Sequence, residues 1–567
     1  MTLQTDDAVT LDPVQDNPRT LDHFLEEAWY KKGEKREPGL RSLVPWQYWF
    51  TMLACGVANS SDASEILCLS YILSNKDFQK NFLQDVSWSS GFLASAVFFG
   101  MLVGGLVVGT LGDSFGRRPM LILGLLCNSV AGILSAVSSN VWQLSALRCI
   151  AGLGIGATVP PLFTLVTEIS PPSQRGAFVT LCASFWMVGS IYVALVALFL
   201  LDYLRYSWRI FAVACALPSI IGAVLVGITV HESPRFLAIH QQQEEALDAI
   251  NKLALRMNYK NADKLYTRSE MFYHYPTGEP VHYTYKNFTT SSVICCITVA
   301  GEGLRDFARS TSNVYSINLW KDTLSMQAIW FSLNFGTYGI LTWITSIFAV
   351  INLENMYFNA LLFSAANLPG NIASAYFIDR IGRTCMLVIS SLASAASLLL
   401  FAFFAEQREN SSMSLSESFN VSGIVISACC FQASSISAWN TIDTMTSERF
   451  PTSIRSTGMG VCAASGRIGA MLAQIVNAAL VQDSPVRILL VASFSLLVSA
   501  IVPLLCYSED FTKKGLVDDF QHDSCQYYEE IIPISDAASN KSDALYLRPN
   551  TLRYQKGSGQ SSGILHE

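Results

Sequence analysis

GTLGDSFGRRPM, at residues 109–120, has a second version at residues 375–386, AYFIDRIGRTCM. Both contain Asp-x-x-Gly-Arg, with Asp113 and Asp379 at equivalent places 266 residues apart. Each version lies between two apolar runs long enough to cross a membrane as helices. The repeat predicts two related halves, each with a tight turn between its second and third membrane helices.

Two further pairs of segments repeat in the same order. TEISPPSQRG at 167–176 matches SERFPTSIRS at 447–456, and both place Glu and Arg seven residues apart. HESPRFL follows the sixth apolar run and YSEDFTK follows the twelfth. Three ordered matches favour an internal duplication over chance.

The composition is that of a membrane protein. Of 567 residues, 51% are hydrophobic and 14% are charged, against roughly 25% charged in an average soluble protein. Twelve apolar runs of about 20 residues recur, and we predict spans at 46–73, 91–111, 119–138, 142–166, 177–200, 210–230, 326–350, 358–378, 385–405, 421–444, 457–480 and 487–506. The predicted fold is an all-α membrane protein with twelve transmembrane helices in two pseudo-symmetric six-helix halves.

The domain order follows from these spans. We expect a cytosolic N-terminal tail at 1–41, an N-terminal six-helix half at 42–230, a cytosolic central loop with short helices at 231–325, a C-terminal half at 326–506 and a disordered cytosolic tail at 507–567. Lysines and arginines gather just before the first span, which by the positive-inside rule places both termini in the cytosol. The membrane is either the plasma membrane or a vesicle or endosomal membrane.

Several classes of function are disfavoured. No Gly-x-x-x-x-Gly-Lys-Ser/Thr loop is present, so gradients rather than ATP must supply energy, and we do not expect an enzyme. The 14 cysteines form no C-x-x-C pair, and neither a metal site nor a cofactor is expected. The net charge of −7 gives no reason to expect nucleic-acid binding.

Four motifs resemble the sugar-porter-like branch of the major facilitator superfamily. They are Asp-x-x-Gly-Arg-Arg after span two, Arg-x-x-x-Gly-x-Gly-x-Gly within span four, Glu-Ser-Pro-Arg after span six and Glu-Arg-Phe-Pro-Thr-x-x-Arg after span ten. Asp-x-x-Glu in span one, IWFSLNFGTYGILTW in span seven and NLPGNIASAYFIDRIGR in span eight most resemble the synaptic vesicle glycoprotein 2 and related-protein group. The resemblance covers about residues 42–510 and implies a transporter that works by alternating access.

The resemblance also implies a cytosolic gate, which locks the halves together in the outward-open state and releases them in the inward-open state. Surface ion pairs contribute about 1 kcal/mol at most, so such a gate must act as a network. The alternatives are a topology signal and a solvated rim. The gate residues are Asp113, Gly116, Arg117, Arg118, Glu168, Arg175, Glu232, Arg235, Asp379, Gly382, Arg383, Glu448 and Arg455.

Four charged residues lie inside the predicted spans, away from their ends: Asp62, Glu65, Arg148 and Arg467. Asp62 and Glu65 are three residues apart, hence on one helix face. Asp62 lies roughly 16 Å from the outer end of span one and Arg148 roughly 10 Å from that of span four, so they are expected to be able to meet. Arg467 faces the same cavity from the other half.

Three interpretations of these carboxylates remain open. In the first, they carry a coupling proton, because burial and a nearby arginine shift a carboxylate's affinity for protons in opposite directions. In the second, they bind a cationic group of the substrate. In the third, Asp62 and Arg148 form a static pair that only orients two helices. Asn334 and Tyr338 of span seven are further predicted cavity-lining residues.

The predicted function is secondary active transport of a small organic solute by alternating access, coupled to protons. One alternative is a transport-poor membrane regulator or vesicle-trafficking protein on the same fold, and another is an organic-cation or sugar facilitator without ion coupling. The expected partners are the solute, protons and membrane lipid. Asn410, in a loop expected on the non-cytosolic side of the membrane, is a predicted N-glycosylation site.

Overall fold

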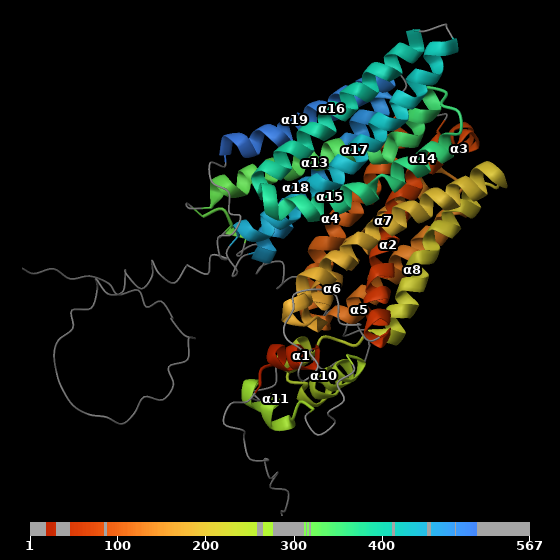
Figure 1. Ribbon diagram of the computed structural model, residues 1–567. Coiled ribbons are helices and arrows are strands. Elements are labelled where there is room, and N and C mark those ends of the chain that lie inside the picture. The colour runs from red at the N-terminus through yellow and green to blue at the C-terminus, as the bar shows by residue number, and fades with distance from the viewer. Residues whose placement is uncertain are drawn as a thin grey trace, which may run out of the picture. The chain divides into compact units, whose positions relative to one another are not determined.

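The computed structural model describes residues 19–29, 46–83, 88–257, 265–275, 311–312, 314–316, 319–410, 414–450, 455–481 and 484–506 (Figure 1). Within these ranges every regular element is a helix. The side chains of residues 107–114, 379, 409, 410, 414–419, 455 and 456 lie outside the description.

A helix lies at every predicted span, which confirms the twelve-helix architecture. The N-half comprises α2 (Trp46–Ser74), α4 (Ser89–Phe115), α5 (Arg117–Ser135), α6 (Val141–Ile169), α7 (Arg175–Ala197) with its π-helical continuation η2 (Leu198–Tyr203), and α8 (Trp208–Thr229). The C-half comprises α13 (Trp320–Val350), α14 (Met356–Ala365) with α15 (Asn367–Ile381), α16 (Arg383–Asn410), α17 (Ser414–Arg449), α18 (Arg455–Leu480) and α19 (Pro485–Cys506).

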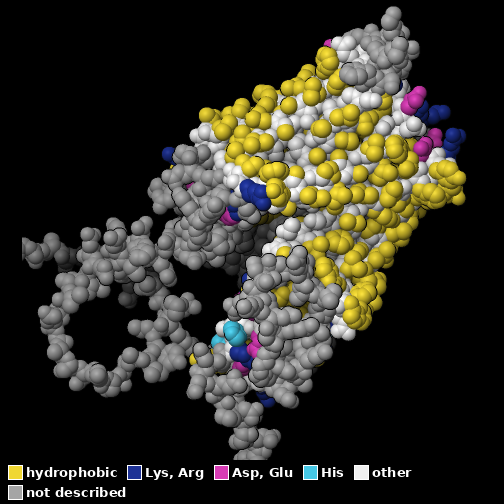
Figure 2. Space-filling model, viewed as in Figure 1, with side chains coloured by type: hydrophobic (Ala, Val, Ile, Leu, Met, Phe, Trp, Pro, Cys, Tyr) yellow, Lys and Arg dark blue, Asp and Glu magenta, His cyan; other side chains and the backbone are white. Residues whose placement is uncertain are grey.

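Ten helices in the described ranges are long and apolar enough to cross a membrane. The other two predicted spans do not meet this criterion of length and apolar character, for physical reasons. The first, α2, has the length but carries a polar run around Asp62, and the eighth is divided at Ala366 into α14 and α15. The space-filling view shows a broad apolar surface over the bundle (Figure 2), as membrane helices require.

Glycines set the closest helix contacts in the N-half. A Cβ at Gly152 or Gly156 of α6, or at Gly100 or Gly104 of α4, would collide with backbone of the facing helix. The Gly-x-Gly-x-Gly pattern within span four therefore serves close helix packing, as small residues do in membrane bundles.

Glycine also makes the two repeated turns possible. Gly116 has φ of 104° and Gly382 has φ of 99°, in a region that side chains other than glycine rarely adopt. Each begins the next helix, α5 or α16, directly after the helix before it.

Four short helices gather at one end of the N-half, here named the α1 end: α1 (Leu21–Trp29), α9 (Pro234–Ile239), α10 (Gln243–Arg256) and α11 (Arg268–His274) (Figure 1). The opposite end, which carries α3 (Lys76–Phe82), is named the α3 end. The sequence predicted no helix in the N-terminal tail, so α1 is an addition. Its four buried residues recur at helical spacing, Leu21, Phe24, Leu25 and Ala28.

Candidate functional site

The two carboxylates of span one are buried. Asp62 is 2% and Glu65 1% exposed, because α2 packs against α6, α7, α8 and α13 and is enclosed by them over most of its length. A polar helix of this kind is tolerated only inside protein, away from lipid.

Glu65 pairs with Arg148. The Glu65 Oε1 to Arg148 Nη1 distance is 3.0 Å, and both side chains are at most 1% exposed. The interpretation in which Asp62 and Arg148 form a static pair is therefore wrong. Glu65 lies roughly 14 Å from the end of α2 and Asp62 roughly 18 Å, against roughly 10 Å for Arg148 from the start of α6, so Glu65 is closer in depth.

Asp62 has a different set of neighbours. Thr158 Oγ1 of α6 lies 3.1 and 3.0 Å from the two carboxylate oxygens, and Ser61 Oγ lies 3.4 Å from one of them. The arginine whose charge acts on Asp62 is Arg467 of α18. Asp62 thus faces across from the N-half to the C-half.

Arg467 lies over an aromatic cluster. Its guanidinium is 5.6 Å from the centre of the Tyr338 ring of α13. Tyr338 packs against Phe98 of α4 and Trp439 of α17, with ring centres 5.1 and 5.6 Å apart. The Nη1 atom of Arg467 is buried and has no hydrogen-bond partner among the described residues, so this nitrogen, with its two N–H groups, can bind another ligand.

Asp443 completes the charged group and was missed by the sequence analysis. The Asp443 side chain is exposed, and the positive charge of Arg467 acts on its carboxylate. The predicted span ended at residue 444, which placed Asp443 at a helix end, but α17 continues to Arg449. Asp443 therefore lies roughly 9 Å inside the helix. The signal available in the sequence was a charged residue inside the predicted span 421–444.

The two remaining predicted cavity residues, Tyr338 and Asn334, have different surroundings. Tyr338 belongs to the aromatic cluster beside Arg467. Asn334 is 1% exposed and donates its amide hydrogen to the carbonyl of Trp330 at 2.7 Å. A Cβ at Gly466 of α18 would meet the Asn334 side chain, so Asn334 lies in the contact between α13 and α18.

The two halves meet directly at the α3 end. Ser70 Oγ of α2 and Thr345 Oγ1 of α13 are 2.8 Å apart, and Thr345 also donates to the Ser70 carbonyl at 2.6 Å. Nearer the middle of the bundle, Asn367 of α15 donates to Ser190 Oγ of α7 at 3.3 Å. These contacts are neutral hydrogen bonds, whereas the predicted gate residues at the α1 end are charged.

At the α1 end, corresponding ion pairs occur in the two halves. Arg117 Nε lies 3.7 Å from Glu168 Oε2, and Arg383 Nη2 lies 3.1 Å from Glu448 Oε1. These pairs join the start of the third span to the end of the fourth in each half, and their placement matches the internal repeat.

Glu232 caps the start of α5. Its carboxylate accepts from the backbone N–H of Arg117 at 3.1 Å and of Arg118 at 3.2 Å. Burial raises the pKa of Glu232, although the N–H donors oppose the shift. Helix N-termini favour such a negative charge, so Glu232 ties α5 to the segment after span six.

Arg175 and Arg235 are linked to α1, a contact the predicted network lacked. Both guanidinium groups reach Asp22 Oδ1, Arg175 at 3.0 Å. Burial opposes ionisation of Asp22, but the hydrogen bond from Arg235 and the charges of both arginines outweigh it and lower its pKa. The side chains of four other predicted residues lie outside the described part: Asp113, Asp379, Arg455 and Asn410.

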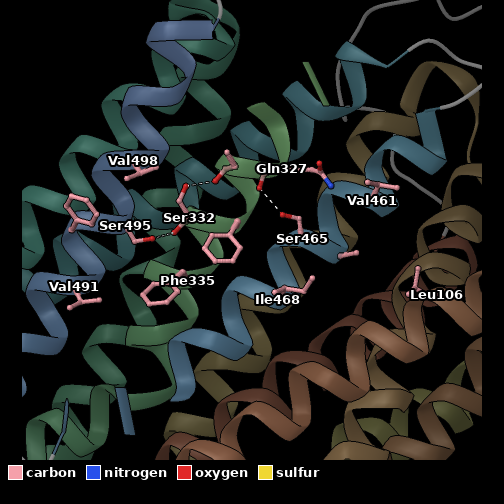
Figure 3. A pocket seen from close by; sticks show the side chains of 14 residues that line it. Leu106, Gln327, Ser332, Phe335, Val461, Ser465, Ile468, Val491, Ser495 and Val498 are labelled. Carbon is pink, nitrogen blue, oxygen red and sulfur yellow. Dashed lines mark hydrogen bonds between the residues drawn. The ribbon is translucent and has the colours of Figure 1, made fainter. Parts of the chain in front are cut away.

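A separate cavity of about 780 Å³ lies among α4, α13, α18 and α19 (Figure 3). Its walls are apolar apart from Gln327 and serines 332, 465 and 495. Ser465 donates to the Gln327 carbonyl at 2.9 Å and Ser495 to the Ser332 carbonyl at 2.8 Å. None of the residues that line this cavity is charged.

Twelve membrane helices in two repeated halves, with charged side chains inside the bundle, are typical of a membrane transporter. The chain belongs to the Major Facilitator Superfamily, whose family model matches residues 68–474 and 362–540.

Named relatives are transporters and vesicle proteins. The chain is 28% identical over 389 residues to the niacin transporter NiaP of Acinetobacter baylyi, covering 68% of this chain and 77% of the relative. It is 29% identical over 407 residues to the organic cation/carnitine transporter 7 of Arabidopsis thaliana, covering 69% and 77%. It is 23% identical over 589 residues to the human synaptic vesicle glycoprotein 2C, covering 80% and 78%.

The fold is similar to that of the xylose transporter XylE from E. coli in its inward-open conformation. The TM-score is 0.62 at 16% identity, over 83% of this chain and 98% of that one. The predicted family, its likeness to the synaptic vesicle glycoprotein 2 group and the multi-pass membrane architecture are therefore confirmed. The chain is a small-solute transporter by family rather than an enzyme.

Proposed function

We propose that this chain transports a small organic solute in a proton-coupled manner, with the solute held between Asp62 of the N-half and Arg467 and Asp443 of the C-half. The observations that carry the proposal are that buried Asp62 of the N-half lies within range of the charge of Arg467 of the C-half, and that Arg467 lies over the ring of Tyr338. Alternating access moves one half against the other around a fixed site, so a group shared by both halves changes its surroundings in each cycle.

The two α2 carboxylates take different roles in this proposal. Glu65 is held by Arg148 within the N-half, so rocking of the halves does not separate the pair. Asp62 is bonded to Thr158 in its own half and faces Arg467 in the other. A change in the Arg467 position alters the proton affinity of Asp62, and Asp62 is the proposed carrier of the coupling proton.

The aromatic cluster and Arg467 suggest how a solute is held. The rings of Tyr338 and Trp439 offer flat apolar surface, the unpartnered Nη1 nitrogen of Arg467 can donate hydrogen bonds, and the exposed carboxylate of Asp443 can accept them. A small solute with a planar or apolar body and polar groups suits such a site. The relatives named for niacin and for organic cations and carnitine suggest the first solutes to test.

We propose that the α1 end faces the cytosol. The basic residues that precede span one support this orientation. The membrane itself, plasma or vesicular, is left open by this proposal.

The test is uptake by the purified full chain in proteoliposomes. Radiolabelled nicotinate, carnitine and xylose are offered with and without an imposed pH gradient, and Asp62→Asn is compared with wild type. Asp248→Asn is the matched control, because Asp248 forms an exposed pair with Lys252 outside the site. We expect Asp62→Asn to lose gradient-driven accumulation while solute exchange continues.

Two results would contradict the proposal. Accumulation by Asp62→Asn that still depends fully on the pH gradient would remove Asp62 as the proton carrier. Absence of uptake for a broad set of solutes by the wild type would favour the regulator or trafficking alternative, which the resemblance to synaptic vesicle glycoprotein 2C supports.

A further inference from the structure

Helix α1 is seated among the short helices and the start of the membrane helices. Phe24 is fully buried and packs on the ring of Tyr266, with centres 5.3 Å apart. Trp29, at the other end of α1, packs edge-on against Phe178 of α7 and Tyr48 of α2 at 5.5 and 5.7 Å. The apolar face of α1 thus bridges the segment just before α11 and the starts of two membrane helices.

Arg19 anchors the beginning of this segment. Its guanidinium binds Glu270 of α11 through two hydrogen bonds, Nε to Oε1 at 2.6 Å and Nη2 to Oε2 at 3.1 Å, and also reaches Glu27 at 3.2 Å. Tyr266 donates its hydroxyl hydrogen to the Arg19 carbonyl at 2.9 Å. A two-point arginine–carboxylate contact fixes orientation as well as position.

Asp22 then connects α1 to two predicted gate residues. Arg175 begins α7 and Arg235 lies in α9, and both bind the same Asp22 oxygen. Glu26 accepts from the backbone N–H of Ser173 at 3.1 Å, in the link between α6 and α7. One turn of α1 therefore holds the link after span four and the segment after span six together.

The gate residues at the α1 end of the N-half carry an excess of positive charge, which Asp22 partly offsets. Among the gate side chains that the structure describes in the N-half, four are arginines, Arg117, Arg118, Arg175 and Arg235, and two are glutamates, Glu168 and Glu232. Asp22 adds a carboxylate where two of these arginines converge. It lowers the positive charge that the N-half presents as the gate closes.

We infer that residues 19–29 form a built-in strap that holds the α1-end connections of the N-half as one body, with Asp22 as the residue that positions Arg175 and Arg235 for gate closure. The described contacts of the strap given above all lie within the N-half and its short helices. The strap acts through those arginines and does not touch the solute site. This inference rests on the proposed transport function only for its effect on turnover.

The test uses the full chain and a charge swap. Arg19→Glu breaks the contact with Glu270, and adding Glu270→Arg restores an opposite-charge pair in the reverse sense. Asp22→Asn removes the second connection without a change in size. The matched control is Arg268→Glu, because Arg268 forms an exposed pair with Glu244 on the same short helices.

Three readouts separate a positioning role from a merely structural one. Hydrogen exchange reports whether residues 21–29 stay protected. Single-molecule fluorescence transfer between labels at Gly176 and Lys321, both exposed and one in each half, reports closure of the α1 end. Uptake into proteoliposomes of whichever of nicotinate, carnitine or xylose the wild type transports separates kcat from KM.

We expect Arg19→Glu and Asp22→Asn to reduce the closed fraction and kcat by about fivefold or more, the usual lower range of coupling between sites. KM should be unchanged, since the solute site is untouched, and the swap should restore protection and closure. The strap is overturned if residues 21–29 exchange freely in the wild type, or if a variant frees them while the closed fraction stays at the wild-type value. Because exchange and fluorescence need no solute, the inference can fail or stand independently of the transport proposal.

Discussion

The buried pair of Glu65 and Arg148 predicts an asymmetry between its two single variants. Both side chains are at most 1% exposed and their nearest charged atoms are 3.0 Å apart. At an effective dielectric constant of about 20, this separation corresponds to an attraction of roughly 5 to 6 kcal/mol before desolvation is subtracted. Removing one member of a buried pair typically costs about 3 to 5 kcal/mol.

The residue that remains in each single variant differs in whether it can become neutral. Glu65→Leu leaves Arg148 charged, because a guanidinium does not give up its proton in proteins. Arg148→Leu leaves Glu65, which can bind a proton and become neutral. We therefore expect Glu65→Leu to be the more destabilising at every pH, and the defect of Arg148→Leu to shrink as the pH falls.

The double variant should recover most of the loss. Glu65 Oε2 and the Nε and Nη2 atoms of Arg148 are buried without hydrogen-bond partners among the described residues, so the pair is incompletely satisfied. Replacement of such a pair by apolar residues is often neutral or stabilising by about 1 to 4 kcal/mol. Glu65→Leu with Arg148→Leu should unfold near the wild-type temperature.

The assay is thermal unfolding of the detergent-purified protein between pH 5 and pH 8, followed by intrinsic fluorescence. Equal, pH-independent losses in the two single variants would refute the reasoning, as would a double variant as unstable as Glu65→Leu. Transport by the double variant is a separate measurement, because stability without the pair does not imply function.

Three further outcomes follow from other contacts. Thr158→Val removes the hydroxyl donor to the buried aspartate of α2, worth roughly 1.5 to 3 kcal/mol for a charged acceptor, and should move the pH profile of uptake to higher pH; an unchanged profile would argue against that aspartate as the proton carrier. Gly152→Val should lower the unfolding temperature, since a Cβ there meets backbone of α4, whereas Gly227→Ala, which meets nothing within 4 Å, should not; equal effects would contradict the packing argument. Burial opposes ionisation of Asp22 and Glu270, but hydrogen bonds from arginine outweigh it and lower both pKa values below their usual 3.8 and 4.5. Their stabilising contribution is therefore present above those values and lost as the pH falls further, so the hydrogen-exchange protection of residues 21–29, corrected for the intrinsic exchange rate at each pH, should fall between pH 5 and pH 2, and protection unchanged over that range would count against the strap.

Much of the fold was predictable because a membrane helix can be recognised from its own segment of the sequence. A run of about 20 apolar residues has little alternative to a spanning helix, and the repeated glycines Gly116 and Gly382 marked turns that only glycine accepts easily. In the short helices after span six the spacing of apolar residues is a poorer guide, because Ile239, at the end of α9, is 64% exposed while Ile250 and Leu253 of α10 are buried. Helix boundaries decide which residues share a face, and the break between α9 and α10 was not visible in the spacing.

The sequence predicted which charged residues lie inside the bundle, but it did not predict which of them pair. Asp62, Glu65, Arg148 and Arg467 stood out from sequence alone because charge inside a membrane span is costly and rare. Glu65 rather than Asp62 meets Arg148, however. Position along a helix gives depth to within a turn, and the two carboxylates are separated by less than one turn.

The sequence by itself determined the membrane architecture, the two related halves, the glycine turns and the presence of charge inside the bundle, since each depends on composition or spacing within one segment. Only the tertiary structure decided which carboxylate pairs with Arg148, that Asp443 joins Arg467, and that Asp22 binds Arg175 and Arg235. Those partners come from segments far apart in the chain, and the rotation and tilt of packed helices bring them together.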